Sequence, residues 1–192
     1  MDNDEIWNIN MHRLMRYMRK LLPFFDIKQD ELCADMGDKS PKMEIIKDKL
    51  GINVEQICDI DFNFDEVKGS YDTIFALQVV EHLQNPLWFM LQLKNALKDD
   101  GKLYVSLPCN PKWLWIDSHY NEISKKYFEK WILKPIGLRI TKYKRINFVH
   151  NWKGIFFGVR PILRVIRGEK DWQSLFRTFL YYRYDIYEIR KI

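Results

Sequence analysis

The stretch Ser70–Pro108, SYDTIFALQVVEHLQNPLWFMLQLKNALKDDGKLYVSLP, has the pattern of a strand, a helix and a second strand. Tyr71–Leu77 is a continuous, mainly apolar run, which is typical of a parallel strand buried on both faces. A helix is expected to begin at Asn85-Pro86, and Lys102–Leu107 predicts the second buried strand. Two buried strands joined by a helix are the unit from which parallel sheets are built, so this stretch predicts an α/β fold.

The same alternation of strands and helices continues on both sides of this stretch. Further strands are predicted at Glu31–Met36, Val54–Asp59, Leu138–Ile146 and Tyr184–Arg190, helices at Glu5–Leu22, Pro41–Leu50 and Ser124–Leu133, and a turn at Asp99–Gly101. Ser40 is the expected N-cap of the helix that follows it, and Gly51 ends that helix. Ligands of parallel sheets lie beyond the carboxyl ends of the strands. Here those ends are Asp35–Gly37, Leu77–His82 and Leu107–Asn110.

The length and composition are those of one globular domain that spans residues 1–192. The 192 residues are 47% hydrophobic and 30% charged, which excludes a disordered or collagen-like chain. The chain begins with acidic residues and has no apolar stretch of membrane-spanning length, so we expect a soluble, cytoplasmic protein. Cys33, Cys58 and Cys109 are far apart, which argues against a disulfide framework or a zinc site. No spacing of His, Cys and Asp residues predicts a metal site.

The charge is unevenly distributed along the chain. The net charge is +5, but residues 1–138 carry −4 and residues 139–192 carry +9. Residues 147–182 predict a basic amphipathic insertion before the last strand, in which Arg160, Arg164 and Arg167 accompany apolar residues. Such a segment could make peripheral contact with an anionic membrane, close over a substrate, or pack over the sheet. A nucleic-acid partner is not favoured, because no nucleic-acid-binding motif is present.

The central stretch resembles the core of class I S-adenosylmethionine-dependent methyltransferases. Four pieces match that family in order, namely Gly69–Asp72 (GSYD), Val79–His82 (VVEH), Asn85-Pro86 (NP) and Leu97–Pro108 (LKDDGKLYVSLP). Farther along, His119–Ser124 followed by Ile136–Leu138 is similar to a downstream segment of the family. The resemblance covers residues 30–146 and a closing strand. It implies a Rossmann-like sheet that is mainly parallel and has an antiparallel last strand.

The cofactor loop of that family, (D/E)xGxGxG, corresponds here to Asp35–Pro41, DMGDKSP. The acid and the first glycine are retained, whereas Lys39 and Pro41 stand at the later glycine positions. Proline is compatible with the first turn of a helix, because its missing N–H would have no partner there. Lys39 is expected to place a long cationic chain where the methionine part of the cofactor would lie.

The chain after this loop is shorter than in the family. Asp72 follows Asp59 by only 13 positions, whereas a strand–helix–strand unit takes roughly 30 residues. The sheet is therefore expected to be reduced by about one β–α unit. Asp59 and Asp61 alternate along the chain, so in a strand both would face the same side. They could hold the ribose hydroxyls of the cofactor, or they could be solvated acids in a loop.

The resemblance also implies which residues form the site. The cofactor-binding candidates are Asp35, Gly37, Asp38, Asp59, Asp61, Leu77 and Gln78, and the catalytic candidates are Glu81, His82 and His119. A histidine near the acceptor could act as a general base at neutral pH. The alternative roles are structural. Glu81 and His82 would then cap the helix that begins near Asn85, and His119 would be hydrogen-bonded to Glu122.

The activity that the resemblance implies is methyl transfer from S-adenosylmethionine to a small-molecule, glycan or lipid-linked acceptor. Because the methyl group on a sulfonium is already electrophilic, such a protein mainly has to align the acceptor and exclude water. The alternative is a catalytically inactive, methyltransferase-like protein that serves as a binding or scaffold module. The altered cofactor loop and the lost β–α unit favour that alternative.

Overall fold

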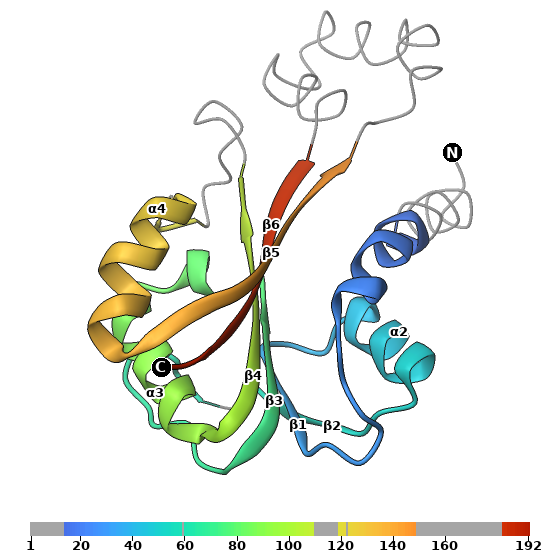
Figure 1. Cartoon of the computed structure of the whole chain (residues 1–192), viewed down its shortest axis with the longest axis horizontal. Helices are drawn as coiled ribbons and strands as arrows, with labels where there is room; N and C mark the ends of the chain where they lie inside the picture. Colours follow the sequence, from blue (N-terminus) through green and yellow to red (C-terminus); the bar gives the residue numbers. More distant parts are fainter. Residues whose placement is uncertain (1–13, 59, 110–118, 122, 149–181) are drawn as a thin grey trace, which may run out of the picture.

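Six strands form one mixed sheet in the computed structural model, which describes residues 14–58, 60–109, 119–121, 123–148 and 182–192 (Figure 1). The strands are β1 (Cys33–Met36), β2 (Val54–Ile57), β3 (Tyr71–Leu77), β4 (Leu97–Pro108), β5 (Leu138–Phe148) and β6 (Tyr182–Lys191), in the order β2-β1-β3-β4-β6-β5. The first four strands are parallel, and β6 is antiparallel to both β4 and β5. This arrangement confirms the predicted α/β sheet, mainly parallel with an antiparallel last strand.

The expected loss of one β–α unit is also confirmed. β2 lies at the edge of the sheet, and the described residues between β2 and β3 form turns rather than a helix and a strand. The reason is length, because too few residues separate the two strands to form a helix and cross back to the sheet.

The start of β4 differs from the sequence-based expectation. Asp99–Gly101 was predicted as a turn before a strand at Lys102, but the strand begins at Leu97. Leu97 pairs with Tyr71, and the register then shifts so that Lys102 pairs with Thr73. The predicted turn is therefore an irregularity within the strand, because the residues before and after it both pair with β3.

Helices cover both faces of the sheet (Figure 1). A helix at residues 14–21 and α2 (Pro41–Leu50) lie on one face, while α3 (Pro86–Ala96) and α4 (Lys125–Tyr127) lie on the other. α4 continues as a π-helical segment, Phe128–Leu133, and a 3-10 turn, Lys134–Ile136. Helical structure was predicted for each of these segments except Lys134–Ile136, whereas the division of the helices between the two faces was not predicted.

The helix starts are set by polar caps, as expected. The hydroxyl of Ser40 accepts the backbone N–H of Met43 at 3.3 Å, and Pro41 occupies the first turn of α2. Gly51 ends α2 in the left-handed conformation, with φ of 65°. The side chain of Asn85 likewise accepts the N–H of Trp88 at the start of α3. These caps fix where each helix begins after the carboxyl end of a strand.

An aromatic cluster anchors the face of the sheet beneath the helix at 14–21 and α2. Phe75 of β3 is fully buried and stacks on Tyr104 of β4 with ring centroids 5.7 Å apart. Phe25 meets both rings edge-on, at 5.3 and 4.9 Å. The phenolic oxygen of Tyr104 accepts the backbone N–H of Asp26 at 3.0 Å, so the ring buries its polar atom with a partner.

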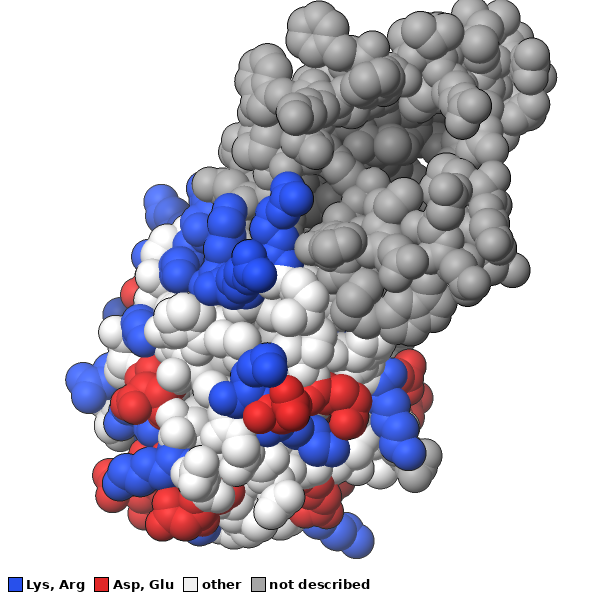
Figure 2. Space-filling view, turned by 90° about the vertical axis from the view of Figure 1, so that its right-hand side faces the viewer, with Lys and Arg blue, Asp and Glu red and all other residues white. Residues whose placement is uncertain are grey.

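The basic insertion predicted at 147–182 falls mostly on residues 149–181, which lie outside the described residues, so its predicted roles stay predictions. On the part of the surface seen in Figure 2, basic side chains gather toward one end, and acidic and basic side chains are mixed elsewhere. In the described part of the chain, no helix combines the length and the apolar character needed to cross a bilayer.

Replacing Phe75 by alanine should destabilise the fold by about 3–5 kcal/mol, because the change leaves a cavity beneath both aromatic neighbours. Phe64 is the matched control, since its side chain is 74% exposed and Phe64→Ala should change stability by less than about 0.5 kcal/mol. Urea denaturation followed by circular dichroism measures both. Equal effects of the two substitutions would contradict the assigned core.

Candidate functional site

A cavity of about 700 Å³ lies beyond the carboxyl ends of β1 and β3. This is the edge at which parallel sheets bind ligands. Eight of the ten residues predicted from the sequence line the cavity, namely Asp35, Gly37, Asp38, Leu77, Gln78, Glu81, His82 and His119. The fold thus brings together three segments that are far apart in the sequence.

Asp35 lies near the carboxyl end of β1 and supplies a buried carboxylate to the cavity. Its side chain is only 5% exposed, and its Oδ2 accepts a hydrogen bond from Nε2 of Gln56 at 3.1 Å. Burial raises the pKa of Asp35 to about 6, although the Gln56 hydrogen bond and the charge of Lys42 both oppose that rise. Burial makes the ionised form of this carboxylate unfavourable, so the carboxylate is suited to accept a cationic ligand group.

Lys42, in the first turn of α2, provides the cation of the cavity. Its ammonium group donates to Oε1 of Gln78 and interacts electrostatically with both Glu81 and Asp35. Burial lowers the pKa of Lys42, while the two neighbouring acids raise it. The site therefore contains an ammonium group that interacts electrostatically with two carboxylates.

The expected position of Lys39 needs correction. Lys39 was predicted to point into the methionine end of the cofactor site, but its side chain is exposed and does not line the cavity. Ser40 caps α2 directly after it, and the residue that faces the cavity from that helix is Lys42. Sequence reasoning located the helix start correctly but missed Lys42, because the family's loop pattern ends at Pro41 and directed attention to Lys39.

The loop between β1 and α2 keeps the one glycine that its backbone requires. Gly37 has φ of 141°, which residues with a side chain rarely adopt, and an added Cβ would lie 3.4 Å from Val79. Its N–H donates to the carbonyl of Ile57 at 3.1 Å, and its carbonyl accepts Nε2 of Gln56. The loop is thus tied to β2, and its backbone stays close to the cavity.

Gln78 ends β3 with an unusual backbone. Its φ is 64°, and it is the one non-glycine residue of the described chain with positive φ. Its N–H still donates to the carbonyl of Ser106 in β4 at 3.2 Å. This conformation turns the chain out of the sheet and brings Val79, Glu81 and His82 to the cavity wall. Strained backbone of this kind is concentrated at functional sites.

Asp59 and Asp61 are the two acids that could hold a ribose according to the sequence. Asp59 lies outside the described residues. Asp61 does not line the cavity, because its carboxylate caps a local turn by accepting from the N–H and the side-chain amide of Asn63, at 2.9 and 3.1 Å. The segment that follows β2 instead contributes the apolar side chains of Ile60 and Phe62 to the cavity.

Glu81 carries the second buried carboxylate. Its side chain is 1% exposed, and its Oε2 atom has no hydrogen-bond partner among the described residues. Burial raises its pKa to about 7, partly offset by its own backbone N–H and by the charge of Lys42. A carboxylate that titrates near neutral pH can exchange a proton with a bound molecule.

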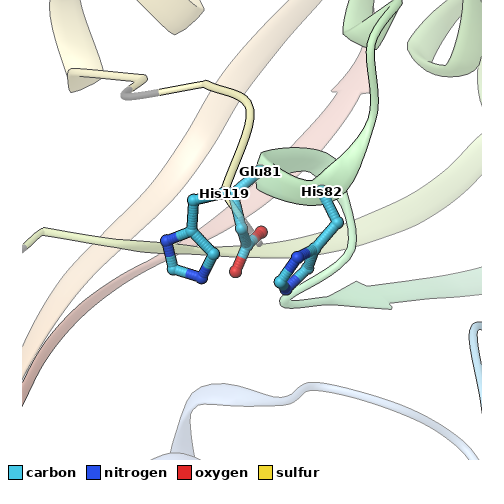
Figure 3. Close-up of side chains that lie close together, drawn as sticks. All are labelled: Glu81, His82 and His119. Atoms are coloured by element: carbon cyan, nitrogen blue, oxygen red, sulfur yellow. The ribbon is translucent and has the colours of Figure 1, made fainter. Parts of the chain in front are cut away.

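His82 and His119 lie close to this carboxylate (Figure 3). Their ring centroids are 4.7 Å apart, with an angle of 78° between the ring planes. Burial and the neighbouring His82 both lower the pKa of His119. The alternative role of Glu81 and His82 as helix caps is not what the structure shows, because the side chain of Asn85 caps α3. Glu122, the alternative partner of His119, lies outside the described residues.

Comparisons with known proteins agree with this geometry. A family model described as "Methyltransferase domain" matches residues 11–152. A search of curated proteins finds no match. Among solved structures, a SAM-dependent methyltransferase from Archaeoglobus fulgidus matches with a TM-score of 0.58, 15% identity and 100% coverage of both chains.

Two further solved structures are similar at low sequence identity. Coclaurine N-methyltransferase, bound to N-methylheliamine and SAH, matches with a TM-score of 0.60 and 12% identity over 94% of this chain and 71% of its own. An O-methyltransferase of a Brevibacillus brevis trans-AT PKS multienzyme, in complex with S-adenosyl-L-homocysteine, matches with a TM-score of 0.59 and 13% identity. That match covers 98% of this chain and 77% of the other. At these identities the likeness shows the shared Rossmann-like fold. Because the family model covers most of the chain, this protein belongs to the methyltransferase-domain family.

Proposed function

We propose that this protein is an S-adenosylmethionine-dependent methyltransferase whose cofactor binds in the cavity beyond β1 and β3. The observation that carries this proposal is the pair of buried Asp35 and half-buried Lys42, which line one cavity with opposite charges. The methionine end of the cofactor is an α-amino acid with an ammonium and a carboxylate group. Asp35 would accept from the ammonium group, and Lys42 would donate to the carboxylate.

The rest of the cavity is compatible with the other parts of the cofactor. The backbone at Gly37 allows a close approach, because no side chain stands between it and the ligand. Ile60 and Phe62 offer apolar contacts to the adenosine part. When bound, the cofactor supplies an electrophilic methyl group on its sulfonium sulfur. The protein then has to orient an acceptor and keep water away from it.

The acceptor is proposed to bind beside Glu81, His82 and His119. These groups line the same cavity, and they include a carboxylate whose pKa is raised to about 7. They could take the proton of an acceptor hydroxyl or amine at neutral pH. We infer a small-molecule, glycan or lipid-linked acceptor, because a cavity of about 700 Å³ has the size of small-ligand sites.

A catalytically inactive binding module is the second candidate, favoured by the loss of the later loop glycines and of one β–α unit. Isothermal titration with S-adenosylhomocysteine separates the two candidates at their first step. Micromolar binding supports the enzyme. No binding up to about millimolar concentration, which corresponds to a binding free energy of about −4 kcal/mol, would exclude the enzyme.

Lys42→Gln should weaken the binding of both S-adenosylmethionine and S-adenosylhomocysteine by about tenfold, because both ligands present the same α-carboxylate. Lys39→Gln is the matched control, since Lys39 is exposed outside the cavity, and should leave affinity within about twofold. Titration calorimetry on the three proteins measures this difference. Tighter binding by Lys42→Gln would mean that Lys42 obstructs the cofactor instead of holding it.

Asp35→Asn should weaken cofactor binding by at least about tenfold and yet stabilise the protein at pH 8, by on the order of 2 kcal/mol. The pKa of Asp35 is raised from 3.8 to about 6, so the folded wild type loses stability as the pH rises through that interval. The stability difference should therefore almost vanish near pH 3, where the carboxyl group is largely neutral in both the folded and the unfolded state. Urea denaturation of both proteins at the two pH values measures this difference in the free energy of unfolding. A variant that is less stable at pH 8 would contradict the assigned burial cost.

A further inference from the structure

Three metal-ligating side chains converge in the wall of the cavity. Glu81, His82 and His119 each offer one ligand atom, and these atoms all lie within 4.8 Å of one another. The sequence predicted no metal site, because His119 is separated from the other two by a long stretch of chain. Figure 3 shows the carboxylate of Glu81 close to both imidazole rings.

One oxygen of the Glu81 carboxylate, Oε2, is buried without a hydrogen-bond partner among the described residues. The side chain of Glu81 is 1% exposed, so water reaches it poorly. A carboxylate oxygen removed from water without a partner costs free energy. A cation between this oxygen and the two imidazoles would remove that cost.

The backbone holds the three groups together without any bound ion. The carbonyl of Glu81 accepts the N–H of Tyr120 at 3.0 Å and the N–H of Asn121 at 3.2 Å. The side-chain amide of Asn121 also donates to the carbonyl of Leu83 at 2.5 Å. These bonds join the segment that carries His119 to the 3-10 turn Val80–His82. The ligands are therefore positioned by the fold.

We propose that Glu81, His82 and His119 bind one divalent transition-metal ion of the Zn²⁺ class. Two imidazole nitrogens and one carboxylate oxygen form the ligand set of zinc sites that keep an open coordination position. Ligand atoms on one Zn²⁺ ion lie about 3.3 Å apart, given bonds of about 2.0–2.2 Å. Small rotations of the side chains would close the site around the ion. Mg²⁺ is disfavoured, since it prefers oxygen ligands alone.

The open position would face the cavity, which all three residues line. The consequence for the acceptor rests on the proposed function. An ion at this point would lower the pKa of a hydroxyl group that coordinates to it. The three side chains would then act as metal ligands instead of proton acceptors, so the hydroxyl proton would pass to solvent. The acceptor would therefore carry a hydroxyl oxygen. Lys42 also interacts with Glu81, and its positive charge favours the ionised carboxylate that a metal ion requires.

The test is calorimetric titration of the untagged, EDTA-dialysed full chain with ZnCl₂ near neutral pH. We expect one ion per chain with micromolar affinity, and at least about tenfold weaker binding by His82→Ala and by His119→Ala. Cys58→Ser is the matched control, because Cys58 lines the same cavity but does not belong to the cluster. Its affinity should stay within about twofold of the wild type, and MgCl₂ should not bind tighter than about millimolar.

Thermal denaturation provides a second measurement. ZnCl₂ should raise the melting temperature of the wild type and of Cys58→Ser, but not that of His119→Asn, which preserves more of the side chain than alanine does. The proposal is overturned if the wild type shows no Zn²⁺ binding, or if both histidine variants retain wild-type affinity. Titration of S-adenosylhomocysteine without metal is independent, so its failure would remove the proposed function and leave the metal site standing.

Discussion

The parallel pairing of β1 with β3 is the constraint on which the site depends. Asp35 of β1 pairs in register with Phe75 of β3, so both strands end at the same edge of the sheet. The residues that follow each strand are thereby brought to one cavity. The aromatic cluster around Phe75 fixes this register from one face, and α3 packs on the other. Without this alignment, Asp35 and Glu81 would not line the same cavity.

The electrostatics of the cavity are costly for folding. Asp35 and Glu81 are both almost fully buried, and burial raises the pKa of each toward neutrality. Lys42 compensates only part of this cost, since one ammonium group serves two carboxylates. A protein optimised for stability alone would bury apolar residues here. Unfavourable charge retained in a cavity is a feature of functional sites, and it is consistent with a family whose ligand carries charged groups.

Most of the fold could be predicted from the sequence because its signals are local. Buried strands, the caps at Ser40 and Asn85, and the interval too short for another β–α unit were all confirmed. The start of β4 was wrong, because the register with β3 depends on pairing between segments that are distant in the sequence.

The site was predicted less completely, since its geometry depends on side-chain direction and long-range contacts. The family's cofactor-loop pattern ends at Pro41 and directed attention to Lys39, so Lys42 was missed although the start of its helix was predicted correctly. The cluster of Glu81 with His82 and His119 depends on backbone hydrogen bonds between distant segments, which no spacing pattern reveals. The roles of these residues in binding and catalysis stay predictions.

The central claim is that Asp35 and Lys42 hold the amino-acid end of the cofactor. A crystal structure of the full chain grown with saturating S-adenosylhomocysteine tests it most directly. The account predicts density for the ligand in this cavity, with its ammonium group about 3 Å from the Asp35 carboxylate and its carboxylate about 3 Å from Nζ of Lys42. Ligand density in which the amino-acid end lies away from both residues, or no density in the cavity, would contradict it.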